Sequence, residues 1–217
     1  MSRAGSDAIW AEEGAPDPRP GDPHAEIVVV CTANICRSPL AEAMLVRAAA
    51  ERCGPDVPLH VSSSGVHGLT GEPAAPLSAE EARERGLDLS RHVARVTDEL
   101  GVWRADLVLT MTETHRGRIV RLLPSASRWT FTIREFARLT SALKPIEDDL
   151  PLRERVRFVT RLAHGARAYV ARPPGREDVS DPYGGPRAGY VEIADELEEL
   201  VARIAPQLFG WRADEPR

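Results

Sequence analysis

One stretch of the chain, residues 27–42, constrains its fold more than any other. The apolar run Ile27–Val30 predicts a short strand buried on both faces, as in the interior of a parallel sheet. Pro39 is expected to be the first residue of a helix, because its missing N–H would be unpaired there anyway. Apolar residues continue at helical spacing to Cys53, and Gly54 is expected to end the helix.

Residues 31–38 therefore predict a tight loop between a strand and a helix. Such a loop presents backbone N–H groups and the positive end of a helix dipole to whatever lies against it. An anion, above all a phosphate group, is the ligand that this arrangement favours.

Composition restricts the class of protein. With 217 residues, 42% hydrophobic and 28% charged, the chain is typical of one globular core with additional segments. A net charge of -5 gives no reason to expect nucleic-acid binding. Three cysteines do not make a secreted disulfide framework, and no apolar run is long enough to cross a bilayer. Residues 1–30 lack a signal-peptide pattern, so a cytoplasmic protein without membrane contact is expected.

The chain alternates between expected strands and helices, which favours a parallel sheet covered on both faces. Further strands are predicted at 59–64, 105–111 and 129–131, and helices at 77–85 (capped by Ser78), 113–123 and 133–139. We predict an α/β fold of the flavodoxin-like, doubly wound type, with a four-stranded parallel sheet of order 2-1-3-4. In such folds the ligand lies beyond the carboxyl ends of the strands, where the loop at 31–38 is placed.

A single domain over residues 25–209 is expected. Residues 1–24 are rich in Pro, Gly, Asp and Ala and predict a disordered lead, and residues 210–217 predict a tail. Residues 141–176 interrupt the strand–helix rhythm and predict a helical insert. A long amphipathic helix over 190–208 is expected to cover one face of the sheet.

Cys31, at the end of the first strand, has two interpretations. A free cysteine is most often a small buried apolar residue. Beside N–H groups, a helix N-terminus and Arg37, however, the thiolate form is favoured, and it is then a nucleophile. Arg37 offers a planar fork that matches two phosphate oxygens, where a plain surface arginine is the alternative. Ser38 is either a helix cap or a hydroxyl that stabilises the thiolate as a leaving group.

The tripeptide Asp181-Pro182-Tyr183 lies far downstream, before the last predicted helix. Alone, an Asp-Pro pair is common in turns. A carboxylic acid in a partly desolvated site can also protonate the departing oxygen of a phosphoester. Tyr183 would then supply an aromatic wall for a phenyl ring.

The spacing from Cys31 to Arg37 and Ser38 resembles the loop of the low-molecular-weight protein tyrosine phosphatase family, Cys-x-Gly-Asn-x-Cys-Arg-Ser-Pro. The positions that match after the cysteine are Asn34, Cys36, Arg37, Ser38 and Pro39. Ala33 departs from the pattern, because the family usually has Gly there.

Two further segments extend the resemblance, which covers about 27–140 and 178–208. Ser63, in the second predicted strand, matches a serine that supports the loop asparagine. His92 lies in a segment similar to Gly-Ile-x-x-x-x-His-x-Ala-Arg, and the match implies that it hydrogen-bonds behind the loop. Asp181 matches the general acid of the family.

The resemblance implies a phosphotyrosine phosphatase. By that match Cys31 attacks phosphorus, Asp181 protonates the tyrosine oxygen and then activates water, and Arg37 holds the phosphoryl oxygens. The implied binding residues are Thr32, Ala33, Asn34, Ile35, Cys36, Ser38 and Tyr183. No metal or other cofactor is expected, the expected partner is a phosphotyrosine-containing protein, and the enzyme is expected to be a monomer or weak homodimer. Cys36 either packs under the loop or, as in the family, pairs with the nucleophile under oxidation.

Three alternatives differ in substrate or in class. Related protein-arginine phosphatases resemble Cys-Thr-Gly-Asn-Thr-Cys, whereas the bulkier, apolar Ile35 favours an aromatic ester. A related arsenate reductase passes a disulfide along further thiols, and no cysteine follows Cys53. A phosphate-recognising module without turnover is a different class, motivated by Ala33 and by the insert. Hydrolysis of para-nitrophenyl phosphate distinguishes this module from the enzymes.

Overall fold

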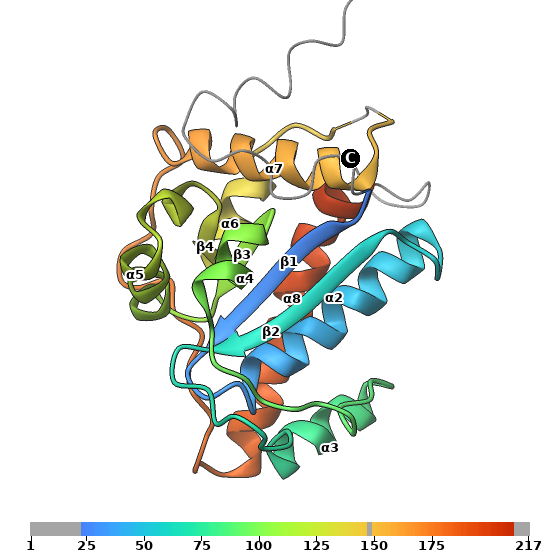
Figure 1. Ribbon diagram of the computed structural model, residues 1–217, viewed down its shortest axis with the longest axis vertical. Helices are drawn as coiled ribbons and strands as arrows, with labels where there is room; N and C mark the ends of the chain where they lie inside the picture. Colours follow the sequence, from blue (N-terminus) through green and yellow to red (C-terminus); the bar gives the residue numbers. More distant parts are fainter. Residues whose placement is uncertain (1–22, 147–148, 211–217) are drawn as a thin grey trace, which may run out of the picture.

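The computed structural model describes residues 23–146 and 149–210 and contains a four-stranded parallel sheet of order β2-β1-β3-β4 (Figure 1). The strands are β1 (Ala25–Cys31), β2 (Leu59–Gly65), β3 (Leu107–Thr110) and β4 (Thr130–Thr132). The predicted α/β fold and strand order are confirmed. All but the first residue of the predicted tail and all but the last two residues of the predicted lead lie outside the described residues.

The helices of the described chain connect and flank these strands. They are α2 (Arg37–Cys53), α3 (Pro76–Glu84), α4 (Glu99–Arg104), α5 (Glu113–Leu122), the 3-10 helix η1 (Pro124–Arg128), α6 (Ile133–Ser141), α7 (Leu152–Ala166) and α8 (Arg187–Phe209). Within this part of the chain, no helix combines the length and apolarity that a membrane crossing needs.

Three of the predicted helix starts are wrong, those of α2, α3 and α8; α8 begins at Arg187 rather than Tyr190. Helix α2 begins at Arg37 rather than Pro39, with Cys36 in the cap position, so Ser38 is not the cap. Proline is tolerated here because the N–H groups of the whole first turn lack intrahelical partners. Helix α3 begins at Pro76, and no side chain caps it, so the predicted cap at Ser78 is also wrong. Pro76 has the fixed φ that suits a first helical residue.

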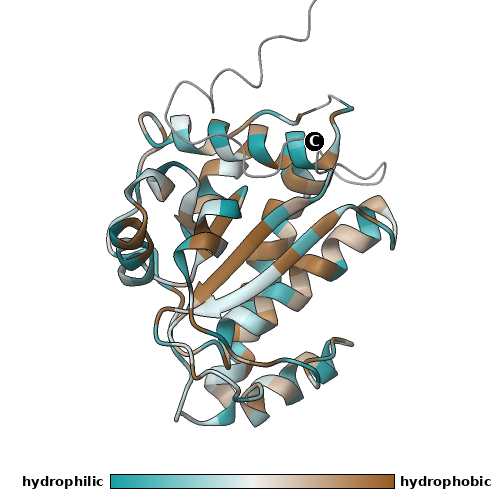
Figure 2. Ribbon diagram, viewed as in Figure 1, coloured by the Kyte–Doolittle hydropathy of each residue, from teal (hydrophilic) through white to brown (hydrophobic). Residues whose placement is uncertain are grey.

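Side chains of β1 alternate between two apolar layers, which explains why helices cover both faces of the sheet. Ile27 and Val29 belong to the larger core, which also receives residues of α2, α6, α7 and α8. Val28 and Val30 belong to a smaller cluster with residues of α4, α5 and η1. Figure 2 shows β1 as mostly apolar, whereas the carboxyl end of β2 is paler because it carries serines.

Helix α7, within the segment predicted as an insert, packs against the sheet at the amino-terminal ends of its strands (Figure 1). Its residues Arg153 and Arg157 contact the carboxylate of Asp106 at 3.3 and 2.9 Å. Asp106 is 1% exposed and also accepts the N–H of Glu26 at 2.9 Å. The paired, hydrogen-bonded carboxylate of Asp106 therefore fixes α7 at the end of the sheet opposite to the loop that follows β1.

Gly65, at the carboxyl end of β2, allows that loop to approach the strand. A Cβ atom at this position would lie 2.5 Å from the carbonyl oxygen of Thr32 and 3.0 Å from the carbonyl carbon of Ala33. Both contacts are with backbone, which cannot rotate away as a side chain can. Glycine is therefore required here for space rather than for its dihedral freedom.

We expect Gly65→Ala to lower the free energy of unfolding in urea by about 1–3 kcal/mol, as overpacking does. Gly165→Ala is the matched control, because Gly165 is an exposed residue of α7 with nothing within 4 Å of the added Cβ. The control should keep or raise stability by up to about 1 kcal/mol, since alanine favours the helix. Equal stability of the two variants would contradict the close approach.

Candidate active site

The loop between β1 and α2 surrounds the sulfur atom of Cys31. Ser38 Oγ lies 3.0 Å from Cys31 Sγ, and the N–H of Asn34 donates to the same sulfur at 3.3 Å. Cys31 is buried, with 2% of its surface exposed. Two hydrogen-bond donors are thus available to a thiolate at this position.

The backbone of the loop carries unused donors. Within the described chain, the N–H groups of Thr32, Ala33, Ile35 and Cys36 donate to no other group. Buried or half-buried N–H groups without partners are rare in folded proteins. They also lie at the N-terminus of α2, where the helix dipole favours negative charge. The loop therefore has the donors that phosphoryl oxygens require.

Asn34 holds this loop in shape. It is fully buried and has a φ of 62°, in the left-handed region that asparagine tolerates better than most residues. Its side-chain Nδ2 donates to Ser38 Oγ at 2.9 Å and to Ser63 Oγ at 2.8 Å, and its Oδ1 accepts the N–H of Arg95 at 2.9 Å. His92 Nε2 lies 2.7 Å from the Asn34 carbonyl oxygen. Ser63 and His92 thus both contact the loop asparagine.

Ala33, where the family pattern has Gly, does not need glycine's conformational freedom. Asn34 is the one described non-glycine residue with a positive φ. The Ala33 methyl group packs against the apolar cluster around Ile35, and its carbonyl accepts the N–H of Leu69 at 3.0 Å. The loop accommodates this methyl group without a strained backbone.

Arg37 connects the loop to the distant acid. Its side chain is almost fully buried, and Nη2 contacts Asp181 Oδ2 at 2.5 Å and Thr32 Oγ1 at 3.3 Å. Nη1 donates to the Val179 carbonyl at 3.0 Å. The N–H on Nε is buried and has no partner within the described chain. It is therefore a donor that Arg37 retains for a phosphoryl oxygen.

Asp181 is delivered by a segment with three consecutive anchors. Glu177 pairs with Arg138 of α6 at 2.7 Å, and Asp178 accepts the first N–H of α5 at 2.7 Å. The N–H of Val179 donates to the carbonyl of Met111, the residue after β3, at 2.8 Å. Sequence reasoning missed these anchors, because their partners lie far away along the chain. The Asp181 side chain itself is 46% exposed, so it can reach both Arg37 and a bound ligand.

Tyr183 and Ile35 differ in their surroundings. Tyr183 is 65% exposed and lies beside the acid, with its N–H donating to Asp181 Oδ1 at 3.3 Å. Ile35 is 6% exposed and belongs to a small apolar cluster. We call this the Ile35 cluster; its buried members are Ile35, Cys36, Ala75, Ala94 and Tyr190.

His115 is a further residue of the site that sequence reasoning missed. It lies in the first turn of α5, is 5% exposed, and places Nε2 3.0 Å from Thr32 Oγ1. Burial, followed by the nearby charge of Arg37, lowers its pKa to about 4, so the ring is neutral at pH 7. No local pattern marks this histidine, because the contact joins the first turn of α5 to the loop after β1, which is distant in sequence.

Cys36 is a second free thiol in the loop. Burial raises the pKa of the Cys36 thiol above its ordinary value, despite a hydrogen bond with Ser78. Cys36 is therefore the protonated, packed cysteine of the loop at neutral pH. Within the described chain, no group of three or more His, Cys, Asp or Glu side chains is arranged to hold a metal ion.

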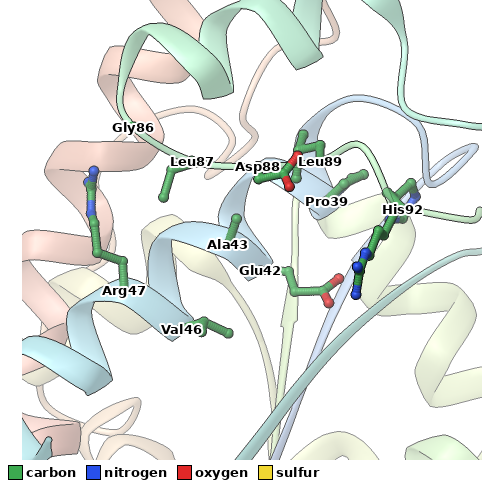
Figure 3. Close-up of a pocket in the computed structure, with 11 residues that line it drawn as sticks. Pro39, Glu42, Ala43, Val46, Arg47, Gly86, Leu87, Asp88, Leu89 and His92 are labelled. Atoms are coloured by element: carbon green, nitrogen blue, oxygen red, sulfur yellow. The ribbon is translucent and has the colours of Figure 1, made fainter. Parts of the chain in front are cut away.

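A pocket of about 460 Å³ lies beside His92, which supports the loop, rather than at Cys31. Figure 3 shows Ala43 of α2 pointing toward Leu87 and Glu42 pointing toward His92, which lies at the edge of the pocket. Cys31 is not among its lining residues. We therefore place the candidate reaction at the Cys31 loop and Asp181, outside this pocket.

Comparison with known proteins identifies the family. Residues 26–158 match the model of the low molecular weight phosphotyrosine protein phosphatases. The chain is 34% identical over 183 residues to the protein-arginine-phosphatase of Bacillus subtilis (strain 168), covering 84% of this chain and 96% of that protein. It is 39% identical over 98 residues to the low molecular weight protein-tyrosine-phosphatase Wzb of Escherichia coli (strain K12), covering 45% of this chain and 62% of that protein.

Among solved structures, the fold resembles a Cys-to-Ser mutant of the YwlE arginine phosphatase with a phosphorylated active-site serine. The TM-score is 0.62 at 31% identity, and the match covers 84% of this chain and 95% of that chain. The chain therefore belongs to the low molecular weight phosphotyrosine protein phosphatase family. The predicted resemblance is confirmed, and phosphorylated proteins are the class of substrate.

We expect Asn34→Ala to lower the free energy of unfolding by about 2–4 kcal/mol. The change removes buried amide bonds and leaves alanine in the left-handed region. Ser63→Ala, which removes one of these bonds, should cost about 1 kcal/mol. Urea denaturation of both variants measures whether Asn34→Ala loses more unfolding free energy than Ser63→Ala. A stable Asn34→Ala variant would show that Asn34 does not hold the loop.

Proposed function

We propose that this protein is a protein-tyrosine phosphatase that hydrolyses phosphotyrosine through a cysteinyl-phosphate intermediate. The proposal is carried by one observation: Asp181 contacts Arg37 at 2.5 Å, at the mouth of the loop that surrounds Cys31. A nucleophile, a phosphate clamp and an acid thus meet although the acid lies far downstream in the sequence.

Binding uses the donors of the loop. The free N–H groups of the loop and the Nε of Arg37 bind the phosphoryl oxygens, with the α2 dipole adding to the attraction. The phosphoryl group also competes with Asp181 for Arg37 Nη2. Asp181 is then displaced toward the ester oxygen, and its half-exposed position leaves room for this change.

In the first step, the Cys31 thiolate forms a bond to phosphorus while the bond from phosphorus to the tyrosine oxygen breaks. Asp181, as the carboxylic acid, gives its proton to that oxygen, so the product leaves as neutral tyrosine. The loop N–H groups and Arg37 stabilise the equatorial oxygens in the transition state.

In the second step, the Asp181 carboxylate takes a proton from water, and the water oxygen attacks the cysteinyl phosphate. The P–S bond breaks, and the Cys31 sulfur leaves as a thiolate, which Ser38 Oγ can stabilise from 3.0 Å. Inorganic phosphate is released. The YwlE mutant with a phosphorylated active-site serine supports a covalent intermediate, because its fold is similar to that of this chain.

The side chains around the loop favour an aryl phosphate as substrate. Tyr183 presents an exposed ring beside the acid, where it can stack on the phenyl ring of phosphotyrosine. The Ile35 cluster is apolar apart from the Cys36 thiol and the Tyr190 hydroxyl, so it offers few acceptors to a substrate guanidinium. A protein-arginine phosphatase is the second candidate, because the arginine phosphatase of Bacillus subtilis matches 84% of this chain.

The acid role of Asp181 predicts a dependence on the leaving group. We expect Asp181→Asn to lower kcat about 10²–10⁴-fold on phenyl phosphate, the range that general acid catalysis supplies. The loss on para-nitrophenyl phosphate should be smaller, because nitrophenolate leaves without a proton. Steady-state kinetics on both esters measure the difference.

Two further variants are the controls for this experiment. Cys31→Ser should abolish turnover of both esters, and Asp56→Asn, at an exposed residue after α2, should behave as wild type. An equal loss on both esters in Asp181→Asn would assign Asp181 a role other than proton donation.

The choice of substrate is predicted to depend on residue 35. We expect the wild-type protein to prefer a phosphotyrosine peptide over an arginine-phosphorylated protein in kcat/KM. Ile35→Thr should reduce this preference about tenfold or more, since a buried hydroxyl adds a hydrogen-bonding group worth roughly 1–2 kcal/mol to a polar substrate. Ile35→Val is the control that keeps the site apolar. A wild-type preference for phosphoarginine would favour the second candidate.

A further inference from the structure

We propose that the Thr32 hydroxyl is an additional donor to the phosphoryl group and that His115 orients it. This inference rests on the proposed phosphatase function and adds a side-chain donor to the backbone donors of the loop. Thr32 follows the nucleophile directly in the chain, and its hydroxyl contacts the phosphate clamp Arg37.

Two groups surround the Thr32 hydroxyl within the described chain. His115 Nε2 lies 3.0 Å from Thr32 Oγ1, and Arg37 Nη2 donates to the same oxygen at 3.3 Å. The same Nη2 also reaches Asp181, at the mouth of the loop. The hydroxyl therefore lies between a histidine that packs behind it and the residues that face a ligand.

The tautomer of His115 determines what the hydroxyl can do. The ring is neutral, so only one of its nitrogens carries a proton. Nδ1 is buried and has no hydrogen-bond partner in the described chain. Because an orphaned buried N–H is rarer than an orphaned acceptor, we place the proton on Nε2. Nε2–H then donates to Thr32 Oγ1.

With this tautomer, Thr32 Oγ1 accepts two hydrogen bonds, one from His115 and one from Arg37. A hydroxyl oxygen has two lone pairs, so both are used, and only its own hydrogen is left. No acceptor for that hydrogen is present among the described residues. A phosphoryl oxygen in the loop supplies one, and the bond is charge-assisted because the acceptor carries negative charge.

The first test measures the binding of inorganic phosphate by calorimetry, without turnover. Thr32→Val keeps the shape of the side chain and removes the hydroxyl, and we expect it to weaken binding about tenfold or more, as the loss of a hydrogen bond to a charged group does. Thr32→Ser restores the hydroxyl and should recover most of the affinity. Unchanged binding by Thr32→Val would overturn the proposal.

The second test separates orientation from general packing. His115→Phe keeps a buried ring and removes the Nε2 donor, and it should weaken phosphate binding several-fold when Thr32 is present. In the Thr32→Val background the same change should have no further effect, because the two residues act through one hydrogen bond. A loss of equal size in both backgrounds would assign His115 a structural role and overturn its part of the proposal.

A failure of this inference can be distinguished from a failure of the proposed function. Phosphate binding by the wild-type protein and turnover of para-nitrophenyl phosphate, abolished by Cys31→Ser, decide whether the site is a phosphatase. The differences among the Thr32 variants decide the inference alone. Thermal unfolding of each variant verifies that the protein is folded. An active wild-type enzyme with a Thr32→Val variant of unchanged phosphate affinity would refute only the role of Thr32.

Discussion

The buried amide of Asn34 is the interaction on which the site depends. A left-handed residue of this kind costs about 1–3 kcal/mol, and the loop adopts it because the side chain then bonds to Ser38, Ser63 and the backbone of Arg95. These bonds join α2, β2 and the segment beyond α3 to a single point. In this conformation the N–H of Asn34 donates to Cys31 Sγ, and the other N–H groups of the loop stay free of secondary structure.

The fold was largely predictable because its signals are local. The apolar run of β1, followed by a loop and a helical pattern, predicted a strand–loop–helix unit. Strand–helix alternation predicted a parallel sheet, and the flavodoxin-like winding gave its order. The starts of α2 and α3 were wrong because proline is tolerated at more than one position of a first turn, so Pro39 and Pro76 could not define them. Boundaries of this kind depend on what the first turn contacts.

Part of the candidate site could be predicted, namely the residues whose side-chain chemistry and position in the sequence both indicated phosphate chemistry. Cys31, Arg37 and Asp181 carry side chains whose types are rare in combination, and the structure places them at one loop. His115 and the anchors at Glu177 to Val179 could not be predicted, since each acts through a partner that is distant in sequence. A lone histidine in a helical pattern has no local feature that distinguishes it from any other buried ring.

The contact between Arg37 and the Val179 carbonyl has a consequence for motion. One end of the guanidinium group holds the backbone that delivers the acid, while the other end faces the ligand. The acid segment cannot swing outward as a lid without also withdrawing a partner from the phosphate clamp. We therefore expect substrate capture to change side-chain partners while the backbone of the acid segment stays in place, which is the kind of motion that occurs by rotamer exchange rather than loop closure.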